Sequence, residues 1–165
     1  MSELAHTPLF DQRALRTAFG TFATGVAVAT ARGAGGELVG LTINSFSSVS
    51  LEPPLVLWSQ SRFAPSHQTF LSASHFAINV LAEDQVLLSE HFARFSADKL
   101  ANVDFVSGAS GAPLLVGATS YFECARETEI NGGDHMIFLG RVECFAHQPS
   151  RPLLFLRGSY CAVQE

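Results

Sequence analysis

The sequence contains little that could serve for covalent crosslinking, metal binding or membrane insertion. Its three cysteines, Cys124, Cys144 and Cys161, are widely spaced and include no C-x-x-C pair. An odd number of distant cysteines predicts neither a disulfide framework nor a zinc site, so we expect reduced thiols and no metal. No apolar run approaches the roughly 18 residues that cross a bilayer as a helix, so no membrane segment is expected.

Positive charge is also scarce. Lys and Arg together number 10 against 15 Asp and Glu, the net charge is −5, and Lys99 is the single lysine. Nucleic-acid binding requires clustered Lys and Arg that neutralise phosphates, so no nucleic-acid ligand is expected. Residues 1–12 lack the charged start and apolar stretch of a secretory leader. These absences together predict a cytoplasmic protein.

Apolar residues, in contrast, are abundant. They make up 47% of the chain, and 14 residues are Phe. A well-filled barrel interior and an apolar surface buried between two copies both explain this composition. A length of 165 residues suits one domain. Because no linker or repeat divides the sequence, we treat residues 1–165 as a single domain.

The residue pattern favours short strands with a few helical segments. Asp11 is a candidate N-cap for a helix that ends by about residue 24 and places Leu15, Phe19 and Phe22 on one face. Further helical turns are expected within residues 65–71 and 82–92. Strands are expected over residues 26–30, 37–44, 55–59, 75–81, 121–130, 136–145 and 153–157.

The longest hairpin has Asn131-Gly132-Gly133-Asp134 as its turn. Glu123, Glu127 and Glu129 alternate along its first arm and predict one wet face. About seven strands, joined by hairpins without a βαβα rhythm, predict a mainly β fold built as an antiparallel barrel with flanking helices. Closure of the sheet is expected to remove its exposed edges.

Common catalytic motifs are missing from the chain. It contains no G-x-S-x-G, no H-E-x-x-H and no P-loop. The glycines of residues 33–36 connect two predicted strands, whereas a dinucleotide fingerprint must open a helix. An enzyme with this sequence would leave its chemistry to a bound cofactor, and we expect no catalytic side chain.

One segment, residues 41–56, is unusually rich in short hydrogen-bonding side chains between two apolar strands. These side chains belong to Thr42, Asn44, Ser45, Ser47, Ser48 and Ser50. Such groups at strand ends can bind a flat heterocycle or a phosphate. Composition alone is equally compatible with a solvated loop after a barrel strand.

This segment resembles the signature of the flavin reductase-like family, the FMN-binding split barrel, where T-x-N-S-F-x-S-V-S-x-x-P-P-L-V is typical. Further similar segments follow in order along the chain: Trp58-Ser59-Gln60-Ser61, Phe76–Leu81, Phe92 with Asp98-Lys99-Leu100, Gly133-Asp134-His135, and Pro152–Tyr160. Ser59 and Gln60 stand where many family members carry an asparagine-containing turn, and Leu100 replaces a commoner aromatic residue.

The resemblance implies a split β-barrel that binds a flavin and a nicotinamide cofactor. The implied flavin contacts, for FMN or FAD, are Thr42, Asn44, Ser45, Ser47, Ser59, Gln60, Ser61, Phe92 and Lys99. The implied nicotinamide contacts, for NADH or NADPH, are Gly133, Asp134, His135 and Tyr160. Hydroxyl groups and an ammonium suit the dianionic flavin phosphate. From the residues alone, Lys99 is equally well a surface lysine, and His135 an inert turn histidine.

The function implied is that of a homodimeric NAD(P)H:flavin oxidoreductase, the short-chain component that supplies reduced flavin to a flavin-dependent monooxygenase. Hydride transfer to flavin N5 requires stacking and exclusion of water, and no general base is obligatory. One alternative is a reductase that uses its flavin on another acceptor, such as a corrinoid. Another is a barrel that stores flavin or haem. The Gly133-Asp134-His135 motif favours the enzymes, because a store needs no nicotinamide contact.

Overall fold

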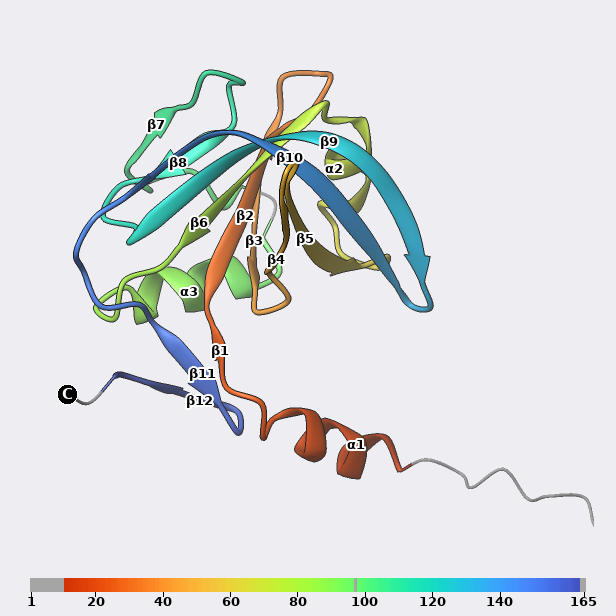
Figure 1. Ribbon diagram of the computed structural model, residues 1–165, viewed down its shortest axis with the longest axis vertical. Coiled ribbons are helices and arrows are strands. Elements are labelled where there is room, and N and C mark those ends of the chain that lie inside the picture. Colours follow the sequence, from red (N-terminus) through yellow and green to blue (C-terminus); the bar gives the residue numbers. More distant parts are fainter. Residues whose placement is uncertain (1–10, 97, 164–165) are drawn as a thin grey trace, which may run out of the picture.

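The computed structural model describes residues 11–96 and 98–163, so the expectation about a leader in residues 1–12 lies almost entirely outside it (Figure 1). The helices are α1 (Gln12–Phe19), α2 (His67–Ser72) and α3 (Val86–Ala93). The strands are β1 (Thr24–Gly25), β2 (Ala27–Arg32), β3 (Leu38–Ile43), β4 (Ser47–Leu51), β5 (Pro54–Ser61), β6 (His75–Val80), β7 (Phe105–Ser107), β8 (Pro113–Leu115), β9 (Ser120–Gly132), β10 (His135–His147), β11 (Leu154–Leu156) and β12 (Ser159–Cys161).

A curved antiparallel sheet of seven strands, in the order β3-β2-β6-β9-β10-β5-β4, forms the body of the molecule. The mainly β, antiparallel class with few helices is therefore confirmed. The expected closure of the sheet was wrong, because the sheet ends at β3 and β4 without joining them, and the barrel is split. Ser45 lies at this split. Its Oγ accepts from the Ser59 N–H and donates to the Ser59 carbonyl, both at 3.0 Å.

Strand β4 was not expected from the sequence, in which residues 47–51 lacked a strand pattern. It pairs with β5 but is otherwise mostly exposed. Hydroxyl side chains tolerate this exposure, so β4 lacks the apolar alternation by which half-buried strands are recognised. An edge strand of this kind is set by its neighbour and not by its own composition.

The barrel interior is filled by aromatic rings. Trp58 is fully buried, stacks on Phe138 with ring centroids 4.7 Å apart, and meets the edge of Phe70 at 4.9 Å. A second core lies under α3, where Phe92 packs so closely on β3 that a Cβ at Gly40 would lie 2.4 Å from its ring. A filled interior thus accounts for much of the apolar composition.

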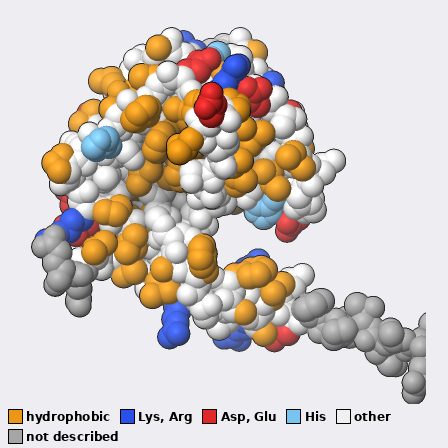
Figure 2. Space-filling view, in the orientation of Figure 1, with side chains coloured by type: hydrophobic (Ala, Val, Ile, Leu, Met, Phe, Trp, Pro, Cys, Tyr) orange, Lys and Arg blue, Asp and Glu red, His pale blue; other side chains and the backbone are white. Residues whose placement is uncertain are grey.

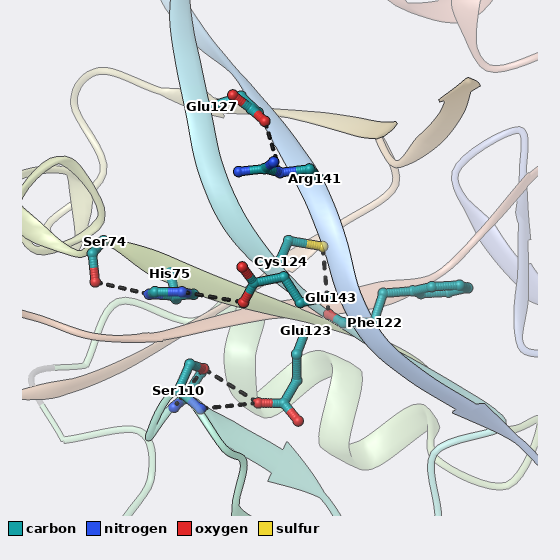
Figure 3. A network of polar contacts seen from close by, with 10 residues as sticks. Ser74, His75, Ser110, Phe122, Glu123, Cys124, Glu127, Arg141 and Glu143 are labelled. Atoms are coloured by element: carbon teal, nitrogen blue, oxygen red, sulfur yellow. Dashed lines mark hydrogen bonds and ion pairs between the residues drawn. The ribbon is translucent and has the colours of Figure 1, made fainter. Parts of the chain in front are cut away.

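The solvent-exposed face predicted for the first arm of the long hairpin forms only in part, and Figure 3 shows the polar contacts of its Glu127 and Glu123. Glu127 is exposed and pairs with Arg141 at 2.9 Å. Glu123, in contrast, is only 5% exposed and accepts hydrogen bonds from the backbone N–H and the Oγ of Ser110, both at 3.3 Å. The loop between β7 and β8 covers this half of β9, so the expectation for Glu123 was wrong.

Helix α1 and the small sheet β1-β11-β12 form an arm beside the barrel (Figure 1). Asp11 caps α1 as expected, since its Oδ1 accepts from the Arg13 N–H at 2.9 Å. The apolar face of this region is not covered by the described chain: Phe19 is 69% and Phe22 78% exposed. Figure 2 shows hydrophobic side chains gathered on the arm and around the hollow that separates it from the barrel. None of the helices formed by residues 11–96 and 98–163 is long and apolar enough to cross a membrane.

Candidate functional site

A cleft of about 420 Å³ opens at the split of the barrel. Its walls come from the end of β3 and the loop after it (41–45), the end of β5 (59–61), and residues 63–65 and 93–95, together with Lys99 and His135. The end of β3 and the end of β5 meet here because Ser45 bridges them. The split in the sheet therefore creates the cleft, and residues far apart in sequence reach it.

Thr42 fixes one wall of the cleft. Its hydroxyl donates to the carbonyl of Ser89 on α3 at 2.6 Å, and the Ser89 Oγ lies 2.9 Å from the Tyr160 hydroxyl. Tyr160 itself lines a smaller, more apolar cavity of about 210 Å³, to which Phe155 also contributes. Thr42 and Asn44 line both spaces, so the smaller cavity is a side extension of the cleft.

Gln60 belongs to the floor of the cleft. It is almost fully buried, its Nε2 donates to the Ser66 Oγ at 2.9 Å, and its Oε1 lies 3.3 Å from the His67 Nδ1. Burial, with a smaller contribution from the Arg62 charge, lowers the pKa of His67 and favours its neutral ring. Gln60 therefore supports the surface on which a ligand would rest, and Ser59 and Ser61 line the cleft on either side of it.

Positive charge reaches the cleft from the segment after α3. Lys99 lines it, and its Nζ donates to the Phe92 carbonyl at 2.8 Å, which leaves two N–H bonds for an anion. Burial lowers the pKa of Lys99. Arg94 also lines the cleft. A phosphate group would find charge-assisted donors at this wall.

His135 is the member of the Gly133-Asp134-His135 motif that lines the cleft. Its Nδ1 lies 2.7 Å from the Asp134 Oδ1, and this hydrogen bond, with the histidine charge, lowers the pKa of Asp134. Gly133 has a φ of 75°, which the turn requires. Arg62 holds the turn beside β5, because its N–H donates to the Asp134 carbonyl at 3.0 Å and its Nε to that of His135 at 3.3 Å.

Two of the expected flavin residues do not line the cleft. Phe92 is fully buried in the core beneath α3, where it faces Gly40. Ser47 is exposed on β4, and its hydroxyl donates to the neighbouring Ser48 carbonyl. Both assignments stay predictions that the geometry of the cleft does not support, because the family motif gives their order along the chain and not the direction in which their side chains point.

Two exposed rings were missed in the sequence. Phe63 and Phe95 line the cleft while 82% and 84% exposed, respectively. Large exposed rings beside a cleft suit the stacking of a flat ligand. Nothing in the composition separates them from the many core Phe residues, although both directly follow an arginine, Arg62 and Arg94.

Comparison with known proteins gives a consistent result. The flavin reductase like domain matches residues 19–164. The chain is 42% identical over 150 residues to the FMN reductase (NADH) SmoA of Agrobacterium fabrum, covering 91% of this chain and 85% of that protein. It is 44% identical over 154 residues to the stachydrine N-demethylase reductase subunit Stc3 of Rhizobium meliloti, covering 93% and 67%.

Among solved structures, the NADH:FAD oxidoreductase SgcE6 of Streptomyces globisporus, in complex with NAD and FAD fragments, superposes with a TM-score of 0.89 at 43% identity over 93% of each chain. The chain spans about half the length of two longer curated relatives, 49% of one and 48% of the other. The family match covers nearly all the described residues, including every strand of the split barrel and the cleft between them. This chain therefore belongs to the flavin reductase-like family.

Proposed function

We propose that this protein reduces FMN or FAD with NADH or NADPH and delivers the reduced flavin to a flavin-dependent monooxygenase. The observation that carries the proposal is the cleft itself. It combines exposed rings for stacking (Phe63 and Phe95), positive charge for a phosphate (Lys99 and Arg94), and a histidine at a hairpin turn (His135). The names of the relatives support both the reductant and the acceptor.

The residues of the cleft fit a flavin. Lys99 and Arg94 would hold the phosphate, and Asn44 and Ser61 offer hydrogen bonds to the polar edge of the ring. When bound, the flavin supplies the hydride acceptor at its N5. The protein's part is to orient two flat rings face to face and to exclude water, which explains why the cleft needs no acid–base pair.

His135 suits a nicotinamide nucleotide in a specific way. Because its Nδ1 bonds to the Asp134 carboxylate, the neutral ring carries its proton on Nδ1 and leaves Nε2 as an acceptor. That nitrogen can accept from the N–H of a carboxamide, and the protonated ring can instead donate to a pyrophosphate. Asp134 thus orients His135.

The same proposal covers partner, assembly and location. The relatives include the reductase component of a trigonelline monooxygenase and the reductase subunit HsaB of another flavin-dependent monooxygenase. The exposed apolar face of Phe19 and Phe22 supports a homodimer. The three cysteines are free in the structure, which supports a cytoplasmic location.

A direct assay tests the activity. The purified protein is mixed with FMN or FAD and with NADH or NADPH, and absorbance at 340 nm is followed under air. We expect flavin-dependent oxidation of the reduced nicotinamide, with no oxidation when either flavin or protein is omitted. Tight flavin binding without any loss of absorbance at 340 nm would contradict the enzyme and favour a flavin store.

A further inference from the structure

The arm has a pocket of its own, of about 530 Å³, where α1 meets the turn between β11 and β12. Three of the ten cationic residues of the chain line it: Arg13, Arg16 and Arg157. Two threonines and two glycines complete the lining that the described residues provide, so no carboxylate faces the arginines there. The pocket shares no lining residue with the cleft, and nothing in the function proposed above uses it.

The fold brings these arginines together from two distant segments. Arg13 and Arg16 are three residues apart on α1 and therefore lie on the same side of the helix. Arg157 comes from the C-terminal hairpin, and its backbone N–H donates to the Gly20 carbonyl at 2.7 Å, which fixes the turn against the end of α1. Within residues 11–96 and 98–163, none of the three guanidinium groups makes a hydrogen bond or an ion pair. Like charges that face one space repel one another, and a bound anion relieves this repulsion.

Helix stability explains only one of the three charges. Arg16 is in the last turn of α1, where a cation interacts favourably with the helix dipole. Arg13 is in the first turn, where a cation is unfavourable. Asp11 is engaged as the N-cap of α1. A hydrogen bond with His135 lowers the pKa of Asp134 most and the Arg16 charge to a smaller extent, so Arg16 lies within electrostatic reach of the hairpin tip without pairing with it.

The backbone at Arg157 is a second, independent observation. Its φ is 51°, in the left-handed region that Gly or Asn adopts at lower cost, and Gly158 follows with a φ of 82°. A residue other than glycine in this conformation often marks a functional position. Arginine is the costly choice for this turn, and its side chain is the one that adds a third guanidinium to the pocket.

We propose that this pocket binds a dianionic phosphate group, as free phosphate or as the phosphate ester of a small molecule, held by Arg13, Arg16 and Arg157. Each guanidinium can donate two parallel hydrogen bonds to phosphate oxygens. The volume lies within the roughly 300–1,000 Å³ that is usual for small-ligand sites. Bound there, the anion joins α1 to the β11–β12 turn and holds the arm in one position.

Calorimetric titration with inorganic phosphate, at an ionic strength kept constant with sodium chloride, tests the site. Lys99→Ala serves as the background, because the cleft offers a phosphate contact of its own. In that background we expect Arg16→Gln and Arg157→Asn each to raise the dissociation constant at least about tenfold. Asn keeps the left-handed turn at position 157. Arg32→Gln is the matched control: this exposed arginine lies outside both pockets, donates to the Gly111 carbonyl, and should leave the constant unchanged.

Thermal unfolding gives a second readout. Phosphate should raise the melting temperature of the Lys99→Ala chain above its value in chloride of equal ionic strength, since it binds the folded state. Phosphate also strengthens apolar burial in any protein, so the comparison is with the two arginine variants, in which the additional rise should be lost. Glycerol 2-phosphate, with glycerol as its blank, identifies the source: binding tighter than that of inorganic phosphate assigns an ester, and equal or weaker binding assigns free phosphate.

Two results would overturn the site. One is the absence of phosphate binding in the Lys99→Ala background. The other is equal binding by that background and by both of its arginine variants, with melting temperatures in chloride showing that the variants are folded. None of these measurements requires reductase activity, so failure of the proposed function would leave them unaffected.

Discussion

His135 uses its two ring nitrogens for different purposes, because Asp134 engages one and leaves the other to the cleft. His135→Ala should raise the Michaelis constant for NADH or NADPH about tenfold, since a contact worth roughly 1.4 kcal/mol is removed. Flavin affinity should hardly change. Steady-state kinetics gives the Michaelis constant, and a flavin titration gives the flavin affinity. A normal Michaelis constant with lost flavin binding would show that the two ligands are placed the wrong way round.

Lys99 is expected to recognise the phosphate of the flavin and not its ring. Lys99→Ala should therefore raise the dissociation constant of FMN more than that of riboflavin, which has no phosphate. Because the Nζ also donates to the Phe92 carbonyl, riboflavin binding serves as the control for any general loosening of the loop in the variant. Lys99→Arg should restore most of the FMN affinity. Equal losses for the two flavins would assign Lys99 a structural role only.

The cysteines differ sharply in their chemistry. Burial, with the nearby charges of Glu143 and Glu123, raises the pKa of the Cys124 thiol to about 12. Cys144 is exposed. Because the thiolate is the reactive species, a disulfide reagent at pH 8 should label Cys144 promptly and Cys124 only after unfolding. Counting released chromophore in the native chain and in Cys144→Ser checks this, and prompt labelling of Cys124 would contradict its burial.

At the scale of elements, the Ser45 side chain joins the end of β3 to the end of β5 with two hydrogen bonds that imitate a strand pairing. Ser45→Ala removes both hydrogen bonds to Ser59, so we expect the free energy of unfolding to fall by about 1–2 kcal/mol and flavin binding to weaken. Ser47→Ala is the matched control, because that hydroxyl bonds only to the next residue and should change neither. Denaturant titrations of the two variants and of the wild-type chain measure these free energies of unfolding. If Ser45→Ala were as stable as the wild-type chain, the Ser45 hydrogen bonds would not stabilise the split of the barrel.

Elements with strong local patterns were predictable from the sequence. The hairpin of β9 and β10 has alternation and a glycine turn, and α1 has its cap at Asp11. Strand β4 and the burial of Glu123 were not predictable, because each depends on a segment that is distant in the sequence and packs against it in the fold. For the candidate site, the residues assigned from the motif stay predictions. The motif gives their order along the chain but not the side-chain directions of Phe92 and Ser47, which do not line the cleft. Phe63 and Phe95 could not be predicted as cleft residues, because the exposure of a side chain is a property of the folded chain.

For the whole molecule, the arm formed by α1 and the hairpin β11-β12 predicts association. Equilibrium sedimentation at micromolar concentration should give roughly twice the 17.7 kDa chain mass. Replacing both Phe19 and Phe22, which are largely exposed, with Asp should shift the species toward the chain mass, because a charged face cannot be buried. A wild-type chain that is monomeric and still reduces flavin would contradict the proposed homodimer.

Arg62 and the β10–β5 ladder join the β9–β10 turn to the end of β5, and this affects how such a protein can evolve. The backbone N–H and the Nε of Arg62 hold the β9–β10 turn beside the end of β5, in addition to the β10–β5 ladder, which extends to the pair of His135 and Ser61. Under the proposed function, substitutions along the tip of the hairpin would alter the preferred reductant while β3 and β5 keep the same flavin. Selection would then tune the electron donor and the electron carrier separately, because Arg62 and the β10–β5 ladder keep their spacing constant.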